Sequence, residues 1–326
     1  MGYFILKALA PIFVILALGY WAGKAKLVDN ANVAILNIFL MDFALPGGLF
    51  LATVQTPWAG IVKQVPLVAV LTLSMWVVYA IVYFVSAKVC RKPLGDTAVL
   101  SLTVALPNYA ALGLPILNGV LGESATTSLN VAIAIACGSV LMTPICLMML
   151  EAAKAQASGA PRLPMTSALP RLMWASMKKP LVFGPILGVI GSALLGAADL
   201  KAPELLLVAF KPLGAASLAA ALFLTGVILS ARKLKINGVV IFSAVLKNLV
   251  QPFIAWGIAL AFGLDPVIVV AGVLLVALSA GFFGVVFGNR YGIQSPDGEG
   301  ALLVSTAAFI VTIPLFIVLT APLLQP

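Results

Sequence analysis

Runs of about 20 predominantly apolar residues recur along the whole chain, and they limit what this sequence can fold into more than any other feature. A helix needs about 20 residues to cross the roughly 30 Å hydrocarbon core of a bilayer. Hydrophobic residues make up 63% of the chain and charged residues only 9%, whereas soluble domains are about 45–50% apolar. The sequence therefore predicts an all-α membrane protein embedded in a lipid bilayer.

Hydropathy and loop residues divide the chain into about ten predicted transmembrane helices. They cover residues 3–22, 31–53, 64–87, 97–121, 126–150, 179–198, 204–230, 236–262, 266–289 and 299–322. The first run is too long for the apolar region of a signal peptide and is followed by further spans, so we expect it in the mature protein. The one long connection, 151–178, separates a first five-helix half (1–150) from a second (179–326).

Positive residues indicate the orientation. If the 151–178 linker is cytoplasmic, most of the loop lysines and arginines are cytoplasmic too: Lys24, Lys26, Lys88, Arg91, Lys92, Lys154, Arg162, Arg171, Lys178, Arg232, Lys233, Lys235 and Arg290. The opposite side keeps Lys7, Lys63 and Lys201. By the positive-inside rule we expect a multi-pass inner-membrane protein with both termini on the non-cytoplasmic side. The net charge of +9 is spread over these short loops, so it does not indicate nucleic-acid binding.

The residue types needed for metal and enzyme chemistry are scarce. The chain has no histidine, and its three cysteines, Cys90, Cys137 and Cys146, lack the spacing of metal ligands. No zinc site or histidine-based catalytic triad can be built from this sequence. We predict no cofactor, no metal site and no catalytic residues, and a membrane-embedded enzyme is the least favoured class.

The two halves carry matching residues about 170 positions apart. The pairs are Pro144 with Pro314, Gly113 with Gly284, and Asn118 with Asn289. Because five is an odd number of spans, a repeated five-helix unit inserts upside down relative to the first. Inverted repeats are typical of secondary transporters, whose binding sites lie at the repeat interface near the bilayer midplane.

The fourth predicted span contains a proline that should interrupt it. Pro107 lacks a backbone N–H and clashes with the preceding turn, and Asn108 is a good N-cap for a second half-helix. That half-helix, starting near Tyr109, would direct unpaired N–H groups and a positive dipole end toward the membrane centre, which favours an anionic ligand. The alternative is an ordinary proline kink without a ligand.

The ninth span has a weaker interruption at the matching place. Ser279, Ala280 and Gly281 are small residues that favour a break and leave backbone groups approachable. Small residues also serve close helix packing, which is the alternative interpretation. The two interruptions together predict broken crossover helices four and nine.

Two ionisable residues lie in the middle of predicted spans, Asp42 in the second and Lys247 in the eighth. Buried charges of this kind usually face an interior path or one another. Lys247 is a candidate ligand for a substrate carboxylate, and Gln251, one turn later, shares its face. A structural Asp42–Lys247 pair is the alternative, and a proton-carrying Asp42 is a third interpretation.

Specific segments carry a resemblance to a known family. Three parts of the sequence resemble the auxin efflux carrier family. They are the stretch from Leu106-Pro107-Asn108-Tyr109 through Gly113-Leu114-Pro115 to Gly122, the stretch from Val286 to Gly292 with Ser305 to Pro314, and Phe43-Ala44-Leu45-Pro46. This family includes plant PIN-formed auxin transporters and bacterial malonate-type permeases. The short 151–178 linker resembles the bacterial members, and the likeness spans essentially the whole chain.

The resemblance implies ten helices in two inverted five-helix repeats. Helices one, two, six and seven would form a scaffold and a homodimer interface, and the others an elevator-type transport domain. By position, Pro107 and Asn108 match the crossover proline and the substrate-contacting asparagine. Ser279 departs from the family, which often has proline there, so the second break can differ in shape.

These observations favour a secondary active transporter of a small carboxylate anion, with malonate as the first candidate. An aromatic acid resembling auxin, or a bile-acid-like anion, is the alternative within transport. A non-transporting membrane sensor or channel-like protein is the rival from another class. The inverted repeats and the absence of a sizeable soluble domain argue against that rival.

Overall fold

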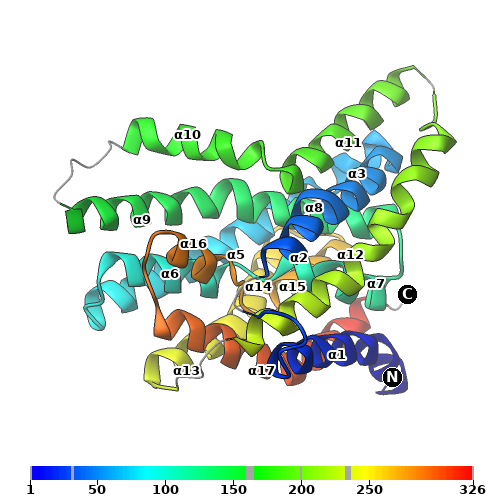
Figure 1. Ribbon diagram of the computed structural model, residues 1–326. Coiled ribbons are helices and arrows are strands. Elements are labelled where there is room, and N and C mark those ends of the chain that lie inside the picture. The colour runs from blue at the N-terminus through cyan, green and yellow to red at the C-terminus, as the bar shows by residue number, and fades with distance from the viewer. Residues whose placement is uncertain (1, 31–32, 159–164, 199, 232–235, 325–326) are drawn as a thin grey trace. The chain divides into compact units, whose positions relative to one another are not determined.

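The computed structural model describes residues 2–30, 33–158, 165–198, 200–231 and 236–324 (Figure 1). These residues form helices and short connections, with no strand among them beyond one isolated bridge. The chain divides into two compact units, and each unit combines segments from the first and the second half of the sequence.

The first unit comprises Met1–Val68, Tyr109–Ile135 and Lys178–Ala231. Its helices are α1 (Gly2–Lys24), α2 (Ala34–Ile38), η1 (Phe39–Ala44), α3 (Leu45–Gln55), α4 (Trp58–Lys63), η3 (Tyr109–Gly113), α7 (Leu114–Leu121), most of α8 (Ala125–Ala136), α11 (Pro180–Ala197) and α12 (Glu204–Ser230). The long helix α12 packs against both α1 and α3, and α11 packs against α3.

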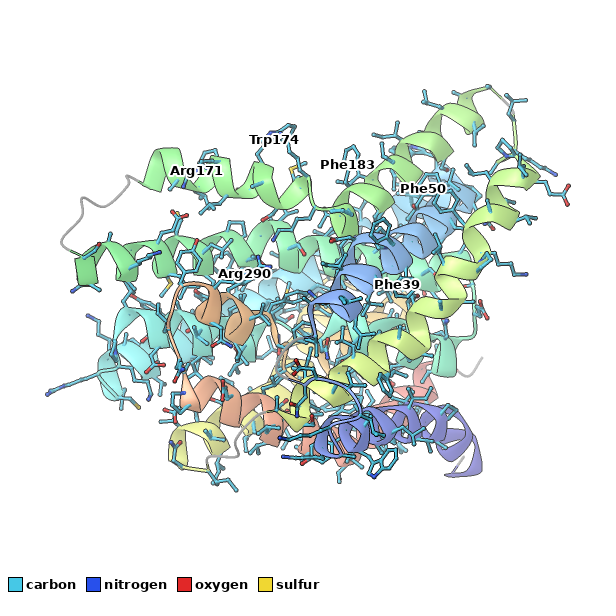
Figure 2. The ribbon with its side chains drawn as sticks, viewed as in Figure 1. Phe39, Phe50, Arg171, Trp174, Phe183 and Arg290 are labelled. Carbon is cyan, nitrogen blue, oxygen red and sulfur yellow. The ribbon has the colours of Figure 1, made fainter. Side chains whose placement is uncertain are left out.

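Glycines let the helices of this unit approach closely. A Cβ added to Gly48 on α3 would lie 2.8 Å from the Cα of Gly214 on α12, and one added to Gly226 would lie 2.6 Å from the backbone nitrogen of Tyr20 on α1. The rings of Phe50 and Phe210 meet at 5.3 Å beside the first contact, and Figure 2 shows Phe50 on α3. Small residues at helix contacts are typical of membrane proteins, where van der Waals packing drives helix association.

The second unit comprises Ala69–Asn108, Ala136–Met177 and Arg232–Pro326. Its helices are most of α5 (Val65–Phe84), η2 (Val85–Val89), α6 (Leu94–Ala105), η4 (Cys137–Met142), α9 (Thr143–Ser158), α10 (Met165–Met177), α13 (Gly238–Val245), η5 (Leu246–Val250), α14 (Gln251–Ala261), α15 (Pro266–Val276), α16 (Phe283–Arg290), α17 (Pro296–Thr320) and η6 (Ala321–Leu324). Helix α6 packs against α9, α16 and α17, so it lies at the centre of this unit.

Seven helical segments in the described part of the chain are long and apolar enough to cross a membrane. They are Ala34–Gln55, Trp58–Val89, Ala125–Ser158, Pro180–Ala197, Glu204–Ser230, Gly238–Ala261 and Pro296–Leu324. Shorter apolar helices cover Leu9–Lys24, Leu94–Ala105, Tyr109–Leu121 and Pro266–Val276. The all-helical membrane fold is confirmed, whereas the count of ten and the inverted relation of the two halves stay predictions.

The predicted 151–178 linker is helical over much of its length. Helix α9 continues to Ser158, and Met165–Met177 forms α10, which lies beside α9 in Figure 1. Arg171 on α10 and Glu151 on α9 form an ion pair at 3.3 Å. Figure 2 shows Trp174 projecting from the side of α10 opposite α9, and its side chain is exposed.

Some of the residues that the orientation argument uses lie outside the described part of the chain. They are Arg162, Arg232, Lys233 and Lys235, and the side chain of Lys7. The orientation of the termini and the division into 1–150, 151–178 and 179–326 stay predictions.

Candidate functional site

The first interruption separates α6 from the next helical segment. Helix α6 ends at Ala105, Leu106 is extended with φ −93° and ψ 110°, and helical structure resumes at Tyr109. Proline at position 107 cannot donate to the preceding turn, which explains why the helix stops there. The predicted interruption at Pro107 is present.

The second interruption separates α15 from α16. Helix α15 ends at Val276, and α16 begins at Phe283. The residues between them include Ser279, Ala280 and Gly281, so the interruption exists without a proline. The run of small residues at Ser279, Ala280 and Gly281 therefore predicted the position of this interruption correctly.

The two interruptions lie against each other inside the second unit and are joined by backbone hydrogen bonds. Pro107 and Ala280 form an antiparallel bridge. The backbone N–H of Asn108 donates to the carbonyl of Ser279 at 2.9 Å, and the N–H of Gly281 donates to the carbonyl of Leu106 at 2.8 Å. Each non-helical segment thus satisfies backbone groups of the other, as unwound backbone at membrane depth requires.

Gly281 has a specific role in this crossing. A Cβ at this position would lie 2.5 Å from the carbonyl oxygen of Leu106, a backbone atom that cannot swing away. The crossing therefore requires glycine here because the two backbones approach too closely for any side chain.

A lysine and a glutamine satisfy carbonyls at the ends of the two interrupted helices. The Lys247 ammonium donates to the carbonyl of Val276 at 2.6 Å and to Gln251 Oε1 at 2.9 Å. Gln251 Nε2 in turn donates to the carbonyl of Ala105 at 2.9 Å. Val276 and Ala105 are the last residues of α15 and α6, so these two fully buried side chains lie at the negative ends of both helix dipoles.

Two polar residues that the sequence analysis did not select complete the network. Ser305 Oγ accepts the N–H of Ala280 at 2.8 Å and donates to Asn248 Oδ1 at 2.6 Å. Asn248 Nδ2 donates to the carbonyl of Ser305 at 3.0 Å and to Thr312 Oγ1 at 3.2 Å. Asn248 lies in the π-helical segment η5, and such segments often occur at functional sites. The sequence feature that could have pointed to Asn248 is its position directly after Lys247, the lysine in the middle of a predicted span.

Some buried polar atoms at the crossing have no hydrogen-bond partner among the described residues. They are Asn108 Nδ2, Asn108 Oδ1 and Ser279 Oγ, and the two residues are 1% and 0% exposed. Buried polar side-chain atoms are normally hydrogen-bonded, and exceptions call for an explanation such as a ligand. The expectation that Asn108 caps the following half-helix is wrong, because its side-chain oxygen accepts no hydrogen bond from any described residue.

Asp42 and Tyr109, the remaining candidate residues, lie in the first unit. Asp42 is exposed and belongs to η1, whereas Lys247 donates its hydrogen bonds to Val276 and Gln251 within the second unit. Tyr109 is 3% exposed and begins η3 directly after Asn108. The pairing of Asp42 with Lys247 and the contact of Tyr109 with a ligand stay predictions.

Comparison with known proteins identifies the family. The family model described as "Membrane transport protein" matches residues 4–317. The chain belongs to this family. It is the auxin efflux carrier family whose motifs the sequence carries, so the recognition from sequence is confirmed, and the family places the chain among membrane transporters rather than enzymes.

Relatives cover nearly the whole chain. The Escherichia coli K12 protein named "Uncharacterized transporter YfdV" is 27% identical over 314 residues, which are 96% of this chain and 97% of that protein. A Rhizobium meliloti protein named "Putative malonate transporter" is 25% identical over 309 residues, 93% of this chain and 92% of that protein. The family match therefore extends over both interruptions.

Proposed function

We propose that this membrane transporter carries a small carboxylate anion, malonate or a close analogue, and that the crossing of the two interrupted helices binds it. The observation that carries the proposal is the set of buried polar atoms on Asn108 and Ser279 that have no hydrogen-bond partner in the described part of the chain. In this account Asn108 Nδ2 and Ser279 Oγ donate to one carboxylate of the substrate. Hydrogen bonds to a charged group contribute about 1.5–3 kcal/mol each.

The charges around the crossing favour an anion over an amine or a sugar. Lys247 is the one ionisable side chain in the hydrogen-bond network described above, and it is fully buried. In this account Lys247 carries its proton when an anionic substrate is bound, and its charge then contributes to the potential felt by that substrate, whether or not Nζ leaves one of its present acceptors to contact the second carboxylate.

Alternating access by an elevator-type movement is the proposed mechanism. Its support is the composition of the two units. The first holds α1, α3, α11 and α12, which correspond to predicted spans one, two, six and seven, the scaffold implied by the family resemblance. It also holds η3, α7 and most of α8, which belong to predicted spans four and five. The second holds both sides of the crossing. We propose further that the scaffold helices form a homodimer in the inner membrane, with both termini on the non-cytoplasmic side.

An aromatic acid is the second candidate substrate, and one observation favours it. The rings of Phe282 and Phe283 lie 4.7 Å apart directly after Gly281, and Phe282 is 4% exposed. Flat apolar rings beside an anion site would suit an aromatic carboxylate. The printed name of the Rhizobium relative supports malonate as the first substrate to test.

Uptake of radiolabelled malonate into proteoliposomes tests the proposal. Wild-type protein should give saturable uptake, and excess unlabelled malonate should compete better than indole-3-acetate. Asn108→Ala should lower the initial rate at least tenfold. Asn130→Ala is the matched control because Asn130 is equally buried and also has a side-chain oxygen without a partner, but lies on α8 in the other unit.

Some results would reject parts of this proposal. If Asn108→Ala transports like wild type, the crossing is not the binding site. Better competition by indole-3-acetate would replace malonate by an aromatic acid. Flux that rises linearly with concentration would indicate a channel and reject a carrier.

A further inference from the structure

A pocket lies within the first unit, and none of the residues that form the helix crossing lines it. It has a volume of about 270 Å³. Its walls come from the C-terminal half of α3, from α7, from the start of α8 with the turn before it, and from α12. The lining residues on which the argument depends are Gln55, Asn118, Glu123, Ser128 and Lys211.

The pocket wall carries one positive and one negative side chain that are not paired with each other. Lys211 and Glu123 are both exposed, and the ion pairs found in the described part of the chain are Lys92–Asp297 and Arg171–Glu151. Opposite charges that share a pocket without neutralising each other leave both free to bind a ligand. A simple anion would be attracted by Lys211 and repelled by Glu123.

Neutral polar groups also line the pocket, beside apolar residues such as Leu51 and Leu114. Asn118 lies on α7, before Glu123 in the sequence, and its Oδ1 is buried without a hydrogen-bond partner among the described residues. Gln55 and Ser128 add an amide and a hydroxyl. An unpaired buried acceptor is satisfied by a ligand that brings N–H or O–H donors.

We propose that this pocket binds a small zwitterion, whose anionic group pairs with Lys211 and whose primary ammonium pairs with Glu123 and Asn118 Oδ1. The volume sets the size of the ligand. It is nearly twice that of the engineered cavity of about 150 Å³ that holds benzene, so a molecule of about ten non-hydrogen atoms fits. A free amino acid and the phosphoethanolamine headgroup of a phospholipid share this chemistry.

Calorimetric titration of the purified, delipidated protein in detergent tests the pocket. The probes are alanine, propionate, which lacks the ammonium, ethylamine, which lacks the carboxylate, and short-chain phosphatidylethanolamine. A zwitterion should bind at least tenfold more tightly than propionate and ethylamine. Tighter binding of alanine assigns the pocket to a soluble amino acid, and tighter binding of the lipid assigns it to a headgroup.

Charge-neutralising variants locate the binding. Lys211→Gln and Glu123→Gln should each weaken zwitterion binding at least tenfold, whereas Glu204→Gln, on α12 outside the pocket lining, should leave it unchanged. Asn108→Ala should also leave it unchanged, which separates this proposal from the one for the helix crossing. Absence of zwitterion binding, equal binding of propionate, or indifference to both pocket substitutions would overturn the proposal.

Discussion

At the scale of single residues, Lys247 is the side chain whose burial is hardest to explain by stability alone. Its hydrogen-bond acceptors are a backbone carbonyl and an amide oxygen, and neither carries the charge that would offset an ammonium. A charged group inside a membrane costs several kcal/mol unless it is compensated. A residue that costs stability and is nevertheless buried in a central network is best explained by function.

Lys247→Met separates these explanations. Methionine removes the charge but leaves the carbonyl of Val276 and Gln251 Oε1 without this donor. Because a buried charge costs several kcal/mol, more than the two lost hydrogen bonds, we expect the apparent Tm of the purified protein to stay the same or rise while the uptake rate falls at least tenfold. Gln251→Leu should instead lower the apparent Tm, because it leaves the carbonyl of Ala105 unpaired at a cost of roughly 1–2 kcal/mol. A fall of both Tm and uptake in Lys247→Met, in parallel with Gln251→Leu, would show a structural role.

The site could be predicted from sequence only in part, and the reason differs between residues. Pro107 and Gly281 could be recognised as helix-breaking residues from the sequence, because proline and glycine differ from all other residues in their backbone properties. The charge of Lys247 inside an apolar run was equally visible. Asn248 and Ser305 escaped notice because a single asparagine or serine in a membrane helix has many roles, and only the fold shows that they meet. Asn108 does lie at the break, as the sequence predicts, but its side chain does not make the expected capping hydrogen bond.

At the scale of helices, the close contact of the two interruptions depends on Gly281. Gly281→Ala should abolish uptake, because its Cβ would press against the carbonyl of Leu106 and separate the two non-helical segments. Gly257→Ala is the matched control, since a Cβ there meets no atom within 4 Å. Transport rate and the amount of protein recovered from membranes should both be measured. Equal uptake by the two variants would contradict the tight crossing.

A polar cluster at one end of the second unit joins three helices. Lys92, before α6, forms an ion pair with Asp297 in the first turn of α17. Asn237, the N-cap of α13, donates to the other oxygen of Asp297 at 2.7 Å. Burial alone would lower the pKa of Lys92, but the hydrogen bond and charge of Asp297 outweigh it and raise that pKa above its usual value.

This raised pKa predicts a pH dependence of stability. A lysine whose pKa is higher in the folded state stabilises the fold fully below its unfolded pKa of about 10.4, and that contribution disappears as the pH rises through the folded pKa. Wild type should therefore have a higher apparent Tm than Lys92→Met at pH 8, with the difference shrinking above about pH 10.5. A difference that stays constant from pH 8 to pH 11 would contradict the ion pair as its source.

The helices themselves were more predictable than the connections. Each predicted span has a helical counterpart because length and apolarity decide that question locally. The 151–178 segment was expected as a linker, since three prolines and several charges suggest a loop. Pro170 is nevertheless accommodated inside α10, and packing against α9 stabilises that helix.

At the scale of the whole molecule, the two compact units do not coincide with the two halves of the sequence. Each half contributes to both units, so the crossing is assembled from residues 103–108 of the first half and 276–281 of the second. A sequence repeat predicts such related segments, but it does not show which parts of each half move or pack together.

The central claim is that the crossing of the two interrupted helices binds the carboxylate, and equilibrium binding measures this most directly. Isothermal titration of purified protein with malonate should show saturable binding that is at least tenfold weaker, about 1.4 kcal/mol, in both Asn108→Ala and Ser279→Ala. Asn130→Ala should retain the wild-type affinity. Malonate binding of equal affinity in all four proteins would contradict the account.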